Sequence, residues 1–325
     1  MSENITITPL NWKAIVGEAL RRRKAEKMTQ REHAALANVS VPTMAAFERV
    51  DTALSLSKAF DILRVVGMTY EPSEENLQDI FVRESFSRWS ALNNELKDSA
   101  IQFPYGWARF DYYLEGELKH IETKEFIKIL NNIATDRYSG LPPFYCSETT
   151  VPKIVNDNAV ECRLKNHGDF WRATPSGRMF LIRGHQEDEI ETFPAQSIFD
   201  TTLPIWRIGE ILLHAERLAA LLKRRENSDI TIHFQASYTG LNGRVLRSWA
   251  MPDNINSQFI TGRNALSNEV FLKAELSVYG LSGRLAEHLY SLTLALYQTF
   301  GITEFPKDLI DTVVKRLFEY HEKYR

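Results

Sequence analysis

The stretch MTQREHAALANVSVPTMAAFERV, residues 28–50, contains two helix starts separated by a short turn. Thr29 and Glu32 have the spacing of a capping box, in which the hydroxyl accepts from a backbone N–H of the first helical turn and the carboxylate accepts from the N–H of the cap. Ser40 is placed to cap the next helix, because a serine oxygen satisfies an N–H that the first turn leaves without a partner. Residues 37–39 lie between them. The stretch therefore predicts a short helix, a three-residue turn and a second short helix.

Two more helices are predicted on either side of this stretch. A helix over residues 9–24 is indicated by apolar residues at helical spacing, and another follows Ser55 and ends at Gly67, because glycine favours helix C-termini. The apolar stripe of the first helix consists of Trp12, Ile15, Val16, Ala19 and Leu20. The four helices together predict an all-α domain over residues 1–70.

Charge is distributed unevenly along the chain. The formal net charge is −3, but residues 1–70 hold ten Lys or Arg and seven Asp or Glu, a net charge of +3, so the remainder carries −6. A basic N-terminal domain on an acidic body is typical of a protein that contacts phosphate at one end only.

The quoted stretch resembles the lambda-repressor-like, or XRE/Cro-type, helix-turn-helix family. The shared features are Thr-Gln at the start of the first helix, a small residue at Ala34, a serine cap at Ser40, and an apolar-x-x-apolar-Glu pattern at the end of the second helix. The resemblance implies binding to double-stranded DNA by a homodimer that reads two half-sites about 34 Å apart. It also implies phosphate contact by Gln30, contacts at the N-terminus of the second helix by Ser40 and Thr43, and base contacts by Val41, Pro42, Thr43 and Ala46.

Three of the four expected base-contacting positions are apolar. Val41, Pro42 and Ala46 can touch a thymine methyl group, but they cannot form the bidentate hydrogen bonds that discriminate between bases by about 1–3 kcal/mol each. We therefore expect sequence specificity to depend on Thr43, on Arg49 or on DNA shape.

A cluster of basic residues lies near the expected path of the DNA backbone. The candidates for phosphate contact are Arg22, Arg23, Lys24, Lys27 and Arg31. The alternative is structural, since basic residues in the last turn of a helix interact favourably with its dipole.

The rest of the chain predicts an α+β fold. Residues 71–138 are expected to form a helical connecting or dimerisation region, and residues 139–325 a mainly antiparallel sheet with long helices packed on it. Strands flank a turn at residues 175–177, and apolar and polar residues alternate over residues 230–235, as in a half-buried strand. Long helices are predicted over residues 204–223, 282–299 and 307–324.

Ionisable residues gather just after a predicted strand in the C-terminal half. Residues 169–188, with residues 204–210, look similar to a region that accompanies schlafen-type AlbA modules in bacterial proteins, a resemblance that implies no established activity. The residues of a possible ligand site, in which Arg183 binds an anion, are Arg183, His185, Glu187, Asp188 and Arg207. The alternatives are a solvated loop and, for Arg207, an ion pair with Glu210.

Signals for catalysis and metal binding are weak. The two cysteines and the histidines show no zinc-ligand spacing, and no cofactor is expected. Asp111, Glu117 and Lys119 match the D…ExK pattern of metal-dependent nucleases, a short triplet that also arises by chance.

No apolar run approaches the roughly 18 residues of a membrane-span candidate, and the first residues do not have the pattern of a secretory signal. We expect a cytoplasmic protein that is nucleoid-associated when bound to DNA. The prediction is a transcriptional regulator, a repressor by default and not an enzyme, whose C-terminal domain senses a small-molecule or protein effector. The alternatives are a nucleic-acid-processing or phage-defence enzyme targeted by its DNA-binding domain, and an antitoxin-like interaction protein.

Overall fold

The chain folds into two compact units, a head at Met1–Glu75 and a body at Asn76–Arg325. Each unit has an apolar core of its own. None of the helices in the described residues is long and apolar enough to cross a membrane. The computed structural model describes residues 11–37, 39–69, 74–94, 103–135, 142–145, 151–155, 158–164, 168–253 and 260–324.

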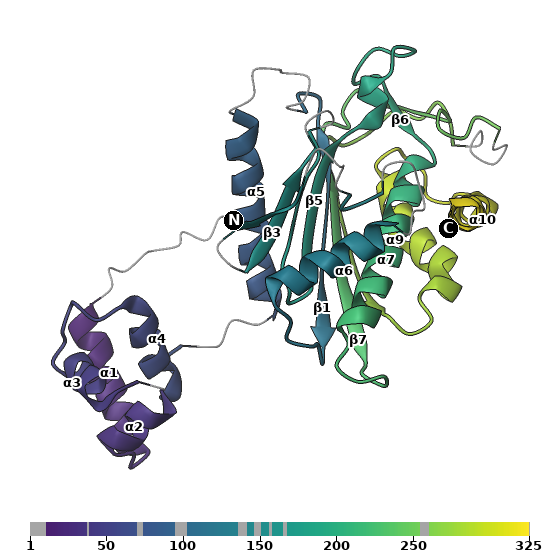
Figure 1. Ribbon diagram of the computed structural model, residues 1–325. Coiled ribbons are helices and arrows are strands. Elements are labelled where there is room, and N and C mark those ends of the chain that lie inside the picture. Colours follow the sequence, from purple (N-terminus) through teal and green to yellow (C-terminus); the bar gives the residue numbers. More distant parts are fainter. Residues whose placement is uncertain are drawn as a thin grey trace. The chain divides into compact units, whose positions relative to one another are not determined.

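The described part of the head consists of four short helices (Figure 1). They are α1 (Trp12–Ala25), α2 (Gln30–Leu36), α3 (Val41–Glu48) and α4 (Leu56–Val65). Each helix contributes its apolar face to one core, which is made of Val16, Ala19, Ala34, Ala37, Met44, Phe47, Ile62, Leu63 and Val66. The predicted helices of residues 1–70 are therefore present and pack together.

The first helix begins later than the sequence predicts. α1 starts at Trp12 and is capped by Asn11, whose side-chain oxygen accepts from the Ala14 N–H at 3.1 Å. The predicted start at residue 9 lies outside the described residues, as does Asn38 in the predicted turn.

The body is built around a seven-stranded sheet with the strand order β2-β3-β4-β5-β1-β7-β9. All neighbouring strands in it are antiparallel. The strands are β1 (Trp107–Gly116), β2 (Lys153–Val155), β3 (Ala159–Arg163), β4 (Phe170–Ala173), β5 (Arg178–Gly184), β7 (Ile230–Tyr238) and β9 (Val270–Ser277). A separate parallel pair is formed by β6 (Ile198–Asp200) and β8 (Val245–Arg247).

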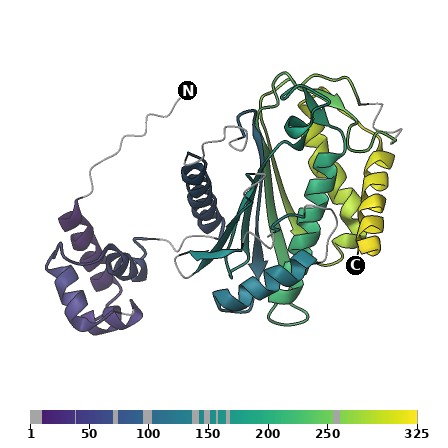
Figure 2. The ribbon, with the colours of Figure 1, turned by 45° about the horizontal axis from the view of Figure 1, so that its top comes forward.

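Helices cover both faces of the large sheet (Figures 1 and 2). On one face lies α5 (Glu74–Asn94), where Phe81 and Trp89 pack against Phe170 and Phe180. The other face carries α6 (Thr123–Thr135), α7 (Leu203–Leu222) and α9 (Leu285–Gln298), and α10 (Lys307–Tyr324) packs against α7 and α9. The predicted α+β class is confirmed, as are the hairpin turn at 175–177, the strand at 230–235 and the C-terminal helices.

The predicted helical region over residues 71–138 is confirmed for α5 and α6 but is wrong as an all-helical region. It contains β1, which is a central strand of the sheet between β5 and β7. Residues 110–114 of this strand are all buried, with Phe110, Tyr112 and Leu114 in the main core and Asp111 on the other face against Gln78 of α5. Apolar and polar residues nevertheless alternate over Ala108, Arg109, Phe110 and Asp111, so the sequence carries a strand signal that the helical prediction overlooked.

Candidate functional site

The second helix of the predicted DNA-binding motif, α3, has one buried and one accessible side. Met44 and Phe47 are buried in the core of the head. The other side carries the predicted base-contacting residues, of which Val41 and Pro42 are exposed and Thr43 and Ala46 are half-buried, and the exposed Arg49 follows the helix end.

Side-chain caps fix the starts of α2 and α3. The Glu32 N–H donates to the Thr29 hydroxyl at 3.2 Å, and the Thr29 N–H donates to the Glu32 carboxylate at 2.8 Å, so the predicted capping box is confirmed. The Thr29 N–H and the Thr29 hydroxyl, which both donate to the Glu32 carboxylate, lower the pKa of Glu32. The Ser40 hydroxyl accepts from the Thr43 N–H at 3.2 Å, which confirms the predicted cap of α3.

One carboxylate joins three helices of the head. Glu48, the last residue of α3, forms an ion pair with Arg23 of α1 and accepts from the Gln30 amide of α2 at 2.9 Å. The angle between the two helices of the motif is therefore held by side chains as well as by the core. Gln30 keeps one amide hydrogen for a phosphate, since an amide nitrogen carries two donors.

Two of the predicted phosphate-contacting arginines have partners inside the head. Arg22 binds Glu18 at 2.9 Å and donates to the carbonyl oxygens of Gly67 at 2.7 Å and Val66 at 3.3 Å, just past the end of α4. Arg23 is held by Glu48. Their positive charges thus stabilise the helix arrangement, in line with the structural alternative for this cluster.

The remaining basic residues of the motif are accessible. Lys24, Lys27, Arg31 and Arg49 are exposed, and none of them has an ion pair or side-chain hydrogen bond within the described part of the chain. Long side chains of this kind can reach a phosphate without first breaking another interaction. The structure therefore leaves four of the six basic candidates available for DNA.

The predicted ligand residues of the body lie in a buried ionic network. Interpretation of this segment as a solvated loop is wrong, because His185 and Glu187 are only 5% and 4% exposed. The pairs are Arg183 with Asp169 (3.0 Å), Arg207 with Glu210 (2.7 Å), Arg244 with Asp188 (2.6 Å), the Glu187 carboxylate with the Asp200 N–H (2.7 Å), and the His185 Nε2 with the Thr239 carbonyl (2.8 Å). The expected ion pair of Arg207 and Glu210 is confirmed.

Two residues at the centre of this network are not apparent from the sequence. Arg244 is fully buried and donates to Asp188 and to the carbonyls of Gly240, Ile198 and Tyr105. Asp200 is also fully buried and accepts from the N–H groups that begin α7 and from those of residues 249 and 250. Arg244 follows Asn242-Gly243, a pair typical of turns, and Asp200 precedes a predicted helix, so neither position signals burial.

Burial changes the protonation of the network. It raises the pKa of Glu187 to about 7, because a carboxylate loses hydration there. Burial and the nearby Arg244 lower the pKa of His185 to about 4. At neutral pH the His185 ring is therefore neutral, and its Nε2–H donates to the Thr239 carbonyl.

A small cavity of about 30 Å³ lies within this network. Among its lining residues are Arg183, Arg207 and Tyr238, and the buried Tyr238 hydroxyl has no hydrogen-bond partner among the described residues. At about 10–15 Å³ for each ordered water, this volume accommodates about two waters. Ligand binding by these residues stays a prediction.

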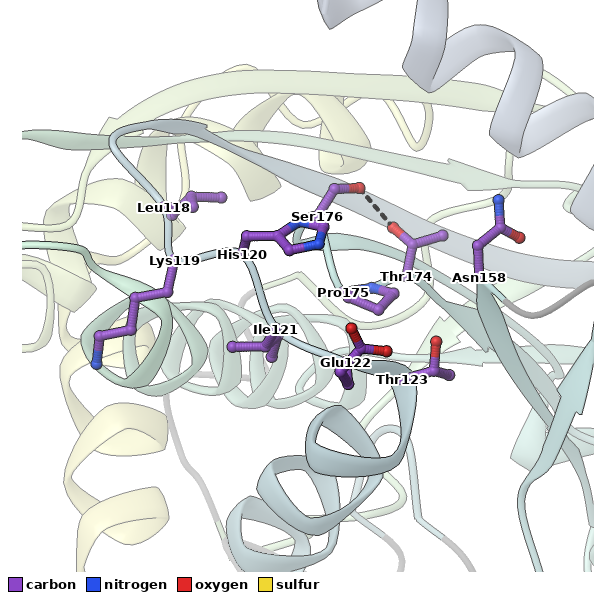
Figure 3. A pocket seen from close by; sticks show the side chains of 10 residues that line it. All are labelled: Leu118, Lys119, His120, Ile121, Glu122, Thr123, Asn158, Thr174, Pro175 and Ser176. Carbon is purple, nitrogen blue, oxygen red and sulfur yellow. Dashed lines mark hydrogen bonds between the residues drawn. The ribbon is translucent and has the colours of Figure 1, made fainter.

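A larger pocket of about 490 Å³ opens between the end of β1 and the β4–β5 hairpin (Figure 3). Lys119 extends away from the other side chains drawn there, and its amine donates to the Leu221 carbonyl at 3.2 Å. On the hairpin side, the hydroxyls of Thr174 and Ser176 are hydrogen-bonded to each other at 2.8 Å. These polar groups of the pocket thus have partners within the body.

The structure does not bring the nuclease-like triplet together. Asp111 is fully buried in the middle of β1, where it contacts Arg109 at 3.0 Å and accepts from Gln78 at 3.2 Å. Glu117 lies past the end of the same strand, roughly 20 Å away at about 3.3 Å per residue, and is exposed. In the described ranges no three His, Cys, Asp or Glu side chains are grouped to hold a metal ion.

No protein-family model, curated protein or solved structure matches this chain. The resemblance of the head to the helix-turn-helix family therefore stays a prediction that rests on its own residues and geometry.

Proposed function

We propose that this protein is a sequence-specific DNA-binding transcriptional regulator of the lambda-repressor-like type, which acts as a dimer and, by default, as a repressor. The observation that carries the proposal is the α2–turn–α3 unit. Both of its helices have side-chain caps, and Glu48 ties both of them to α1. The side of α3 that carries Val41, Pro42, Thr43 and Ala46 is accessible to a partner.

The charge pattern around α3 supports the same function. Arg31 on α2 and Arg49 at the end of α3 are exposed and have no partner within the described residues. Ser40 and Thr43 lie at the α3 N-terminus, where N–H groups and the helix dipole favour a phosphate. Val41 and Pro42 supply apolar contact, so thymine methyl groups are the base feature that this surface fits best.

The body is not proposed to contact DNA. The charged side chains of its buried ionic network are paired with one another, and its small cavity suits water better than a metabolite. We assign to the body the task of bringing two heads together, while the sensing of an effector stays a prediction. Location in the cytoplasm, with nucleoid association on DNA binding, belongs to the same proposal.

Selection of binding sites from random double-stranded DNA tests the proposal. The full-length chain is expected to enrich a palindrome, and Thr43→Ala/Arg49→Ala is expected to lose it. The matched control is Thr52→Ala/Lys58→Ala, which removes a threonine and a basic side chain from exposed positions outside α2 and α3. An absence of any enriched sequence, or equal enrichment by both double variants, contradicts the proposal.

Salt dependence separates phosphate contacts from base contacts. For Arg31→Ala, we expect the slope of log K against log salt to fall by about 0.9 for each phosphate that the variant can no longer bind. For Arg21→Ala, whose arginine is paired with Glu18 on α1, we expect an unchanged slope. The measurement is fluorescence anisotropy of a labelled duplex at several salt concentrations, and equal slopes for the two variants count against contact by Arg31.

A further inference from the structure

The large sheet ends at β9, a regular eight-residue strand. β9 pairs with β7 on one side, and no strand of the described residues pairs with it on the other. The Val278 N–H donates to the Ile230 carbonyl at 3.0 Å, so the even-numbered residues of β9 direct their backbone groups toward β7. The backbone groups that point to the outer edge are those of Phe271, Lys273, Glu275 and Ser277.

The sequence of this edge is complementary to itself. When two β9 strands are placed antiparallel with Ala274 opposite Ala274, Lys273 lies opposite Glu275 of the second copy, and the pair occurs twice. In the same register the outward-pointing residues meet each other, as a hydrogen-bonded antiparallel pair requires. Leu272 then lies opposite Leu276 on the side of the sheet that faces the helices.

Other registers are disfavoured. A shift by two residues places Lys273 opposite Lys273, or Glu275 opposite Glu275, and like charges in directly opposed positions destabilise a strand pair. A shift by one residue sets outward-pointing backbone groups against inward-pointing ones. Charged side chains of one sign are sufficient to protect an edge strand from aggregation. This edge instead carries opposite charges two residues apart, at Lys273 and Glu275.

The surface next to the edge leaves room for a second copy. A groove of about 330 Å³ runs between β9 and α9. On its α9 side lie Ser291 and Ala295, which are small, exposed and one turn apart. Small residues at this position allow the α9 helices of two copies to approach each other across a two-fold axis.

We infer that β9 is the dimerisation strand: it pairs antiparallel with β9 of a second copy around a two-fold axis at Ala274, so that the two sheets become one. Such an interface uses the same surface on both subunits, as closed two-fold dimers do. The surface is argued from the edge itself, and only its consequence, the pairing of two heads on two half-sites, rests on the proposed function.

Charge exchange tests the register. Sedimentation of the full-length chain should show a dimer whose dissociation constant rises about tenfold or more for Lys273→Glu and for Glu275→Lys. The double variant Lys273→Glu/Glu275→Lys restores opposite charges at both positions and should recover the dimer. Lys315→Glu, an exposed charge reversal on α10, is the control and should sediment like the wild type. A monomeric wild type, or a double variant no tighter than the singles, overturns the inference.

Cross-linking tests the position of the axis. Ala274 would face its own copy at a non-hydrogen-bonded position, with Cα atoms about 4.5 Å apart, which lies within the range of a disulfide. With Cys146→Ser as the background, Ala274→Cys should form a covalent dimer on mild oxidation. Ser277→Cys should remain monomeric on a non-reducing gel, because its mate would lie roughly 20 Å away along the strand. Equal cross-linking of the two variants, or none, overturns the axis.

The two proposals fail in different ways. A dimer with the expected charge-exchange behaviour but without sequence preference for DNA removes the regulator function and leaves the interface. A chain that selects a palindrome while Lys273→Glu and Glu275→Lys bind it as cooperatively as the wild type removes the interface and leaves the function.

Discussion

The head and the body use their charged side chains in opposite ways. In the head, a few ionic interactions hold the helices, and four basic residues around the motif remain exposed. In the body, arginines and carboxylates are buried in pairs, and Arg244 is fully buried with hydrogen bonds to four different segments. The head therefore has charge available for a partner, whereas the body uses its charge for its own stability.

This difference explains why the same residue types have different meanings in the two units. A surface ion pair contributes about 0–1 kcal/mol, so a basic residue in the head can exchange its partner for a phosphate with little loss of stability. Breaking a buried pair by removing one partner costs about 3–5 kcal/mol, because the other charge stays buried. The network of the body is thus a poor place for an exchange of partners.

The largest effect is expected at Arg244. Arg244→Met leaves the Asp188 carboxylate without its partner and several carbonyls without donors, so the free energy of unfolding should fall by about 3–5 kcal/mol. Urea unfolding of the full chain followed by circular dichroism measures this change. Arg244→Lys should recover only part of it, since an ammonium group cannot reproduce the planar fork of donors.

Arg263→Met is the matched control for Arg244, because Arg263 is exposed and has no side-chain partner in the described ranges. Its free energy of unfolding should stay within about 0.5 kcal/mol of the wild type. If both variants are equally stable, the buried charges of the body contribute no more to stability than surface charges do. That result contradicts the difference between head and body.

A pH-dependent effect is expected at Glu187. Burial raises its pKa from 4.5 to about 7, so the folded state binds more protons than the unfolded state between these values. Stability contributed by the protonated carboxyl is present below pH 4.5 and is lost as the pH rises to about 7. At pH 8, Glu187→Gln should therefore be more stable than the wild type by about 3 kcal/mol, and near pH 4.5 the two should be equal.

The difference between the wild type and Glu187→Gln is the quantity to follow, because other buried groups titrate as well. Burial lowers the pKa of His185 to about 4 and that of His214 to about 3, which removes stability as the pH falls below 6.5. Burial raises the pKa of Asp111 to about 6, which acts in the same direction as Glu187. Parallel stability curves for the two proteins between pH 4.5 and 8 contradict the assignment to Glu187.

The sequence predicts the head better than the body for a physical reason. The caps at Thr29 and Ser40 act within three or four residues, so their spacing is visible in the sequence. Arg22 has one local partner, Glu18, but Gly67, which also holds it, and Glu48, which holds Arg23, lie 45 and 25 residues away. Spacing indicates the Glu18–Arg22 pair, but it could not show the distant contacts that hold these two arginines.

In the body, the features that sequence reasoning missed depend on distant parts of the chain. β1 is an exception, because Ala108, Phe110 and Leu114 alternate with Arg109, Asp111 and Glu115, a pattern typical of a strand that the sequence prediction missed. Arg244 and Asp188 are 56 residues apart, and each stands in a locally polar segment that is typical of a loop. Turn residues are informative where a turn is closed locally, as at residues 175–177, whereas the long-range pairing of Arg244 with Asp188 leaves no such pattern.

The smallest expected effect is at Ser40, where it separates the stability of the head from its surface chemistry. Ser40→Ala removes the cap of α3 and should lower the stability of the head by about 1 kcal/mol. Ser40→Asp preserves the cap, since aspartate is as good an N-cap as serine, but places a negative charge where we expect a phosphate. Ser40→Asp should therefore unfold like the wild type and bind DNA more weakly than Ser40→Ala. Thermal unfolding and fluorescence anisotropy measure the two quantities, and tight DNA binding by Ser40→Asp means that the α3 N-terminus does not approach the DNA backbone.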